Sequence, residues 1–129
     1  MMQRKDNRKI IVRNAFLRVA ETLREWDVPI ADTIILKDEI VDSPSFYAVT
    51  HYDEEKHRYE VTVSELIWKE YKRRPSEALR YILMHELCHT IDGCFNHGKK
   101  WRQWVERLNE EHGTKINPHP FSAKPTDLF

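Results

Sequence analysis

The chain has few of the residues that define several protein classes. Its 129 residues include two cysteines, Cys88 and Cys94, and three glycines. Two cysteines are too few for a disulfide framework, so we interpret both as reduced packing residues, with zinc ligation by Cys94 as the minor alternative. There is no apolar run of membrane-spanning length, and no apolar stretch follows the basic N-terminus as a signal peptide would require. We therefore expect a cytoplasmic protein that is not attached to a membrane.

An excess of charge of one sign is also missing. The 21 basic and 21 acidic residues cancel, so the whole molecule has no strong electrostatic attraction to nucleic acid. The first thirteen residues are basic, which we interpret as a solvated helix start rather than a phosphate-binding segment. The length and the 40% hydrophobic content predict one domain over 1–129, as a monomer. We expect the polar segment 1–9 and the proline-rich segment 118–129 to be flexible.

The spacing of apolar residues predicts an α+β fold. Apolar residues from Val12 to Trp26 repeat at helical spacing, and residues from Trp101 to Leu108 repeat in the same way. Alternating β-branched and aromatic residues predict three short strands in an antiparallel or mixed sheet, the last two forming a hairpin. The expected elements are helix 8–26, strands 33–36, 45–52 and 58–63, a short helix 65–71 capped by Ser64, a motif helix from Pro75 to Gly93, and helix 99–111 ended by Gly113.

A metal-binding motif lies within one predicted helix. Residues 85–89 read His-Glu-Leu-Cys-His, and positions i and i+4 of an α-helix share a face, so His85 and His89 can bind the same ion. Glu86 lies at the edge of that face, where it can take a proton from a water molecule beside the ion. This is the arrangement of zinc hydrolases. Apolar residues precede the motif, so its polar groups are expected to be buried and costly to leave unpaired.

A catalytic zinc ion usually takes three protein ligands and one water molecule. We favour His97 as the third ligand, because the helix is expected to break at Gly93 and a short loop can then return the chain to the metal. Gly98 would let the backbone pass close to the site. The other histidines and a glutamate of the last helix stay open as alternatives. These are His51, His57, His112, His119, Glu106, Glu110 and Glu111.

The order of several sequence blocks resembles the SprT-like (Spartan-like) zinc metallopeptidases over roughly residues 45–117. The blocks are a strand that runs into Ser64-Glu65, the motif helix from Leu83 to His89, His97-Gly98 followed by Trp101, and Arg107-Leu108-Asn109 before the segment Gly113 to Ile116.

The resemblance implies a zincin-like fold, a zinc ion bound by His85, His89 and His97, and Glu86 as the catalytic base. The loop between His89 and His97 is shorter than is usual in such proteins. No cysteine follows Cys94, so the chain resembles a bare catalytic domain without a cysteine zinc ribbon. The link of such proteins to substrates crosslinked to DNA makes DNA-associated proteins one expected class of substrate.

Together these observations predict a zinc-dependent metallopeptidase that hydrolyses peptide bonds of protein substrates. An extended substrate is expected to pair with an exposed sheet edge, for which we favour strand 45–52. Tyr47, Tyr52 and Tyr59 are candidate oxyanion donors, since they lie near the expected cleft. Two alternatives stay open. One is a zinc-binding interaction module that does not catalyse, and the other is a regulatory peptidase for a single partner, DNA-bound proteins included.

Overall fold

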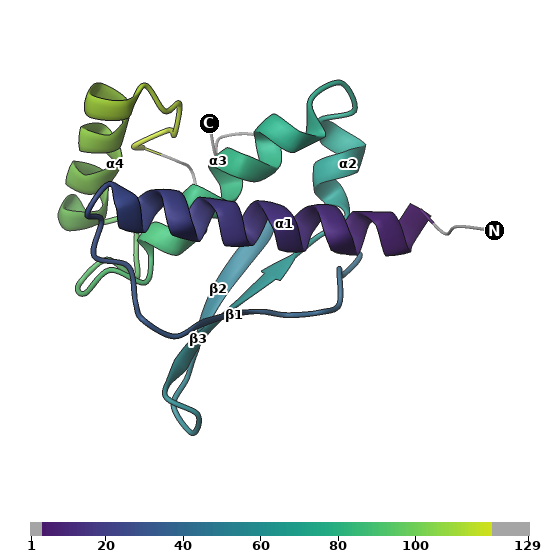
Figure 1. Ribbon diagram of the computed structural model, residues 1–129, viewed down its shortest axis with the longest axis horizontal. Coiled ribbons are helices and arrows are strands. Elements are labelled where there is room, and N and C mark those ends of the chain that lie inside the picture. The colour runs from purple at the N-terminus through teal and green to yellow at the C-terminus, as the bar shows by residue number, and fades with distance from the viewer. Residues whose placement is uncertain (1–3, 120–129) are drawn as a thin grey trace.

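The computed structural model describes residues 4–119 and has the predicted α+β architecture. One helix precedes the three strands along the chain, and three helices follow them. Figure 1 shows the N-terminal helix crossing in front of the motif helix and the upper end of the sheet, from which a hairpin extends. The elements are α1 (Arg4–Glu25), β1 (Ile34–Leu36), β2 (Ala48–Asp53), β3 (Arg58–Val63), α2 (Leu66–Glu70), α3 (Pro75–Cys88) and α4 (Lys99–His112).

The sheet is mixed and has the strand order β1-β3-β2. β3 pairs in parallel with β1 and in antiparallel with β2, with Thr50 opposite Val61 in the hairpin. Side chains alternate between the two faces of a strand, so Ala48 and Thr50 are buried while Val49 and His51 are exposed. β2 is therefore an edge strand whose buried face contacts α3.

The long helix α1 packs along α3 and closes the core. Its buried stripe follows helical spacing and consists of Val12, Phe16, Val19 and Leu23. The helix begins at Arg4, inside the segment expected to be flexible, and ends at Glu25, one residue before the predicted end, with Asp27 at a φ of 60°. Residues 1–3 and 120–129, which complete the two termini expected to be flexible, lie outside the described residues.

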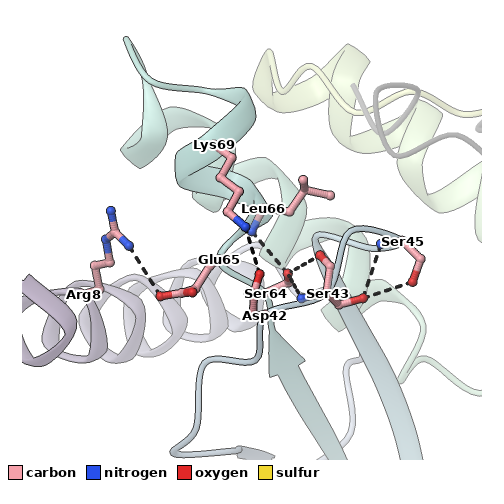
Figure 2. A network of polar contacts seen from close by, with 8 residues as sticks. All are labelled: Arg8, Asp42, Ser43, Ser45, Ser64, Glu65, Leu66 and Lys69. Carbon is pink, nitrogen blue, oxygen red and sulfur yellow. Dashed lines mark hydrogen bonds and ion pairs between the residues drawn. The ribbon is translucent and has the colours of Figure 1, made fainter.

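Ser64 organises the junction between β3 and α2. Its buried hydroxyl donates to the Ser43 carbonyl oxygen over 2.8 Å and accepts from the backbone N–H groups of Ser43 and Leu66. Figure 2 shows this network together with the ion pairs Arg8–Glu65 and Lys69–Asp42, which border it. The predicted cap is thus present as a side-chain hydrogen bond to Leu66, although the N-cap residue by backbone position is Glu65.

Replacing Ser64 with alanine is expected to lower the free energy of unfolding by about 1–3 kcal/mol, because two backbone N–H groups lose their acceptor. Urea unfolding followed by circular dichroism measures the change. Ser45→Ala is the matched control, since the Ser45 hydroxyl is exposed and bonds only to Ser43. Equal losses in the two variants would mean that the buried network adds nothing to stability.

The C-terminal helix ends as the sequence predicts. Gly113 adopts a φ of 69° and its N–H donates to the Asn109 carbonyl oxygen. The Asn109 side chain then holds the following segment: Nδ2 donates to the Ile116 carbonyl oxygen over 2.7 Å, and Oδ1 accepts from Thr114 Oγ1 and from the Ile116 N–H. The Asn109 block and the Gly113–Ile116 block of the sequence are therefore parts of one structural unit.

Several other predicted bounds differ from the structure, those of β1 and α4 by one residue at one end. β2 begins at Ala48 rather than at residue 45, and α2 covers Leu66–Glu70 rather than 65–71. The motif helix ends at Cys88 and not at Gly93, which instead forms a turn with a φ of 79°. Across the described part of the chain, no helix combines the length and the apolar character that a membrane span requires.

Candidate metal centre

The last turn of α3 positions the first two histidines of the centre. His89 follows the final helical residue as the C-cap, but its φ of −66° and ψ of −16° are still helical. The spacing of four between His85 and His89 therefore keeps both rings on one face. Both side chains are buried, which follows from the position of this helix in the core.

His97 reaches the same point from the segment that precedes α4. The Nε2 atom of His97 lies 2.9 Å from Nε2 of His85 and 3.1 Å from Nε2 of His89. The Nε2 atoms of His85 and His89 are 3.3 Å apart. Over residues 4–119 these three side chains form the group that could hold a metal ion, two of them buried and His97 half-buried.

The three nitrogens fit a metal ion better than they fit one another. A tetrahedral ion with metal–nitrogen distances of 2.0–2.1 Å has nitrogen–nitrogen edges of about 3.3 Å, close to the distances in the triangle. Nδ1 of His89 lies 2.9 Å from the Cys94 carbonyl oxygen, which can only accept, so Nδ1 carries the proton and donates it there. In the neutral ring, Nε2 is then unprotonated and has a free lone pair. A cation placed between the three Nε2 atoms can bind this lone pair together with Nε2 of His85 and His97.

The protonation states also suit metal binding. Burial lowers the pKa of His85 well below its usual value, and the neighbouring His89 and His97 lower it further. Burial lowers the pKa of His89 to about 4, against the opposing effect of its hydrogen bond to Cys94. Burial also lowers the pKa of His97. All three imidazoles are therefore neutral near pH 7, the form that binds a metal.

Trp101 of α4 packs against all three imidazoles. Its ring centroid lies 4.8 Å from that of His85 and 4.7 Å from that of His97, both at steep angles. It stacks on His89 with an interplanar angle of 14°. The indole is fully buried, so it restricts the rotation of the three rings and keeps water from one side of the centre.

Glu86 is buried beside the histidines. Thr50 Oγ1 donates to Glu86 Oε1 over 2.7 Å, and Oε2 lies 3.7 Å from His85 Nε2, so Oε2 is the oxygen nearer the centre. Burial raises the pKa of the Glu86 carboxyl to about 8, while the hydrogen bonds with Thr50 act to lower it. A cation between the imidazoles would favour the carboxylate, because nearby positive charge lowers a carboxyl pKa.

The segment between His89 and His97 is shaped by local hydrogen bonds. Asn96 Oδ1 accepts from the Gly98 N–H over 2.9 Å. A Cβ added at Gly98 would lie 2.7 Å from Asn96 Oδ1, so this glycine makes room for the Asn96 side chain. This contact lies within the segment itself, and the expectation that Gly98 lets the backbone pass close to the metal stays a prediction.

The other candidate ligands lie outside the cluster. His51, His57, His112 and His119 are exposed. Glu106, Glu110 and Glu111 are also exposed on α4. Cys88 and Cys94 are buried free thiols, as predicted, and Cys94 contributes its carbonyl oxygen to His89 rather than its sulfur to the cluster.

The three tyrosines considered as oxyanion donors have different environments. Tyr47 is fully buried and packs on Tyr71, so it is a core residue. Tyr52 and Tyr59 form a cross-strand ring contact at 4.9 Å and have partly exposed side chains.

Comparison with models of known protein families gives a match to this chain. The model of the SprT-like family matches residues 36–121, a range that contains Thr50, Glu86 and the three histidines of the metal centre. No curated protein and no solved structure matches the chain.

Proposed function

We propose, because the chain belongs to the SprT-like family, that it is a zinc-dependent metallopeptidase which hydrolyses peptide bonds of protein substrates. The observation that carries the proposal is the convergence of three neutral imidazoles beside the buried carboxyl of Glu86. His85, His89 and His97 would hold the ion. Imidazole nitrogens suit zinc, whereas Mg²⁺ and Ca²⁺ prefer oxygen ligands.

When bound, a zinc ion lowers the pKa of a water molecule towards neutrality and polarises the carbonyl of the scissile bond. Glu86 would accept a proton from the attacking water molecule as the water oxygen forms a bond to the carbonyl carbon. Glu86 then delivers the proton to the amide nitrogen as the carbon–nitrogen bond breaks, so the products are a carboxylic acid and an amine. Thr50 holds Glu86 Oε1, which leaves Oε2 as the oxygen available to transfer the proton.

The substrate main chain would bind along the free edge of β2. An edge strand offers unpaired N–H and C=O groups to an extended peptide, and this mode of binding tolerates many sequences. The edge position of β2 and the contact between Thr50 and Glu86 support this assignment, because they bring the strand next to the proposed base.

We propose a monomer in the cytoplasm, and the two free cysteines support a reducing compartment. We also propose DNA-associated proteins as one class of substrate, and this rests on the family resemblance rather than on the basic start of α1, where Arg8 pairs with Glu65 at 3.5 Å. A zinc-binding module without catalysis would have no use for Glu86, whose burial raises the free energy of its charged form.

Removal of the metal is expected to abolish hydrolysis of an unfolded protein such as casein. The loss should be at least about 100-fold, since the ion contributes several kcal/mol to the transition state. Activity should return with one equivalent of Zn²⁺ and not with excess Ca²⁺ or Mg²⁺. The assay follows new amine groups before and after dialysis against a chelator. Hydrolysis that continues in metal-free protein would contradict a metallopeptidase.

A further inference from the structure

Three aromatic side chains form a continuous cluster beside the metal centre. Tyr52 of β2 and Tyr59 of β3 meet edge to face with ring centroids 4.9 Å apart. Phe95 approaches Tyr59 from the segment before His97, with ring centroids 6.3 Å apart. We call these three residues the aromatic cluster.

The aromatic cluster borders the proposed catalytic residues from two directions. Thr50 and Tyr52 lie two positions apart on β2, so their side chains leave the strand on the same face, and Thr50 is hydrogen-bonded to Glu86. Phe95 lies between Cys94, whose carbonyl oxygen holds His89, and Asn96, which precedes His97. An apolar group held by the cluster would therefore lie close to both Glu86 and the histidines.

Two side chains of the aromatic cluster, Phe95 and Tyr52, are exposed rather than buried in the core. Phe95 is 52% exposed and Tyr52 is 37% exposed, although burial of large apolar side chains stabilises a protein. Aromatic rings also gain from contact with a further ring or an aliphatic chain.

We propose that the aromatic cluster binds an apolar side chain of the substrate, aromatic or long aliphatic, next to the scissile bond. This inference rests on the proposed peptidase function. Occupation by a substrate follows from position, because a peptide paired with the edge of β2 runs past Tyr52 towards Glu86. Burial and the neighbouring Tyr52 raise the pKa of the Tyr59 phenol, and the nearby carboxylate of Asp92 raises it further. Its negative charge disfavours acidic side chains at this position.

The test begins with the cleavage sites of the wild-type protein in a mixture of unfolded proteins, mapped by mass spectrometry. Phe, Tyr, Leu and Met should be enriched at one position next to the scissile bond. Two peptides that differ only there, one with Phe and one with Ala, are then compared. Phe95→Ala should lower kcat/KM for the Phe peptide about 10-fold and change that for the Ala peptide less than about twofold. Tyr52→Ala should act in the same direction from a different element.

Leu17→Ala is the matched control, because Leu17 of α1 is 54% exposed and has no place in the proposed site. It should leave the ratio between the two peptides unchanged. Zinc content equal to wild type in each variant shows that the metal centre is intact. Cleavage without enrichment, or equal loss of both peptides in Phe95→Ala, overturns the role of the cluster and leaves the peptidase standing. A wild-type protein that is loaded with zinc and cleaves nothing overturns both.

Discussion

Replacing Glu86 with glutamine is expected to lower kcat for peptide hydrolysis by at least about 100-fold while the protein keeps its zinc. General acid–base catalysis contributes about 10²–10⁴ to a rate. The amide oxygen of glutamine can still accept the hydrogen bond of Thr50, which is 2.7 Å long in the wild type, so the local packing survives. An amide cannot accept the proton of the attacking water. Steady-state kinetics and metal analysis on the same sample measure both quantities.

Glu77→Gln provides the control for Glu86→Gln. Glu77 also lies on α3, where it is partly exposed and pairs with Arg74 at 3.4 Å, and its replacement should change neither kcat nor zinc content. Hydrolysis by Glu86→Gln at the wild-type rate would exclude Glu86 as the base. If the wild type also lacked activity while binding zinc, the non-catalytic module would become the better description.

Replacing His97 with alanine is expected to weaken zinc binding by more than about 100-fold. Changes to groups that only support a metal ligand already cost 10–100-fold in affinity, and this change removes a ligand. Competition with a chromophoric chelator measures the dissociation constant. His51→Ala is the matched control, because its side chain is exposed on β2 and the change should leave zinc affinity as it is.

Two outcomes would contradict the assignment of His97. Unchanged zinc affinity in His97→Ala would mean that another group completes the site, and an acidic residue of α4 would then have to move inward. Equal loss in His51→Ala would mean that the measurement reports stability rather than ligation. The Nε2 atom of His97 lies within 3.1 Å of the Nε2 atoms of His85 and His89, which supports the three-histidine ligand set.

The local parts of the site could be predicted because helix geometry is fixed. A spacing of four places His85 and His89 together whatever the surroundings, and Glu86 follows from its position between them. Gly113 could likewise be assigned as a helix end, since its φ of 69° suits glycine. The prediction of His97 as the third ligand depended on the short loop after His89, which limits how far the chain can move away from the other two histidines.

The remaining parts depend on contacts between distant segments. Thr50 and Glu86 are 36 positions apart, and nothing in either segment points to their hydrogen bond. The motif helix ends at Cys88, after which the backbone N–H groups of His89, Thr90 and Ile91 donate to carbonyl oxygens three residues earlier rather than four. The Thr90 hydroxyl also accepts from the Ala31 N–H of the distant segment after α1. The packing of Trp101 on three rings could be predicted only as burial, since helical spacing does not name the partner.

The connection between His89 and His97 has a thermodynamic consequence. Several of its backbone groups are bonded within the protein: Cys94 N donates to the Ile91 carbonyl oxygen, and the Cys94 carbonyl oxygen accepts from His89 Nδ1. The conformational entropy of ordering this loop is therefore lost during folding rather than when the ion binds. The site is preorganised, and the ion would not have to assemble it. Small structural zinc modules unfold when their metal leaves, whereas this domain would exchange its ion with the fold in place.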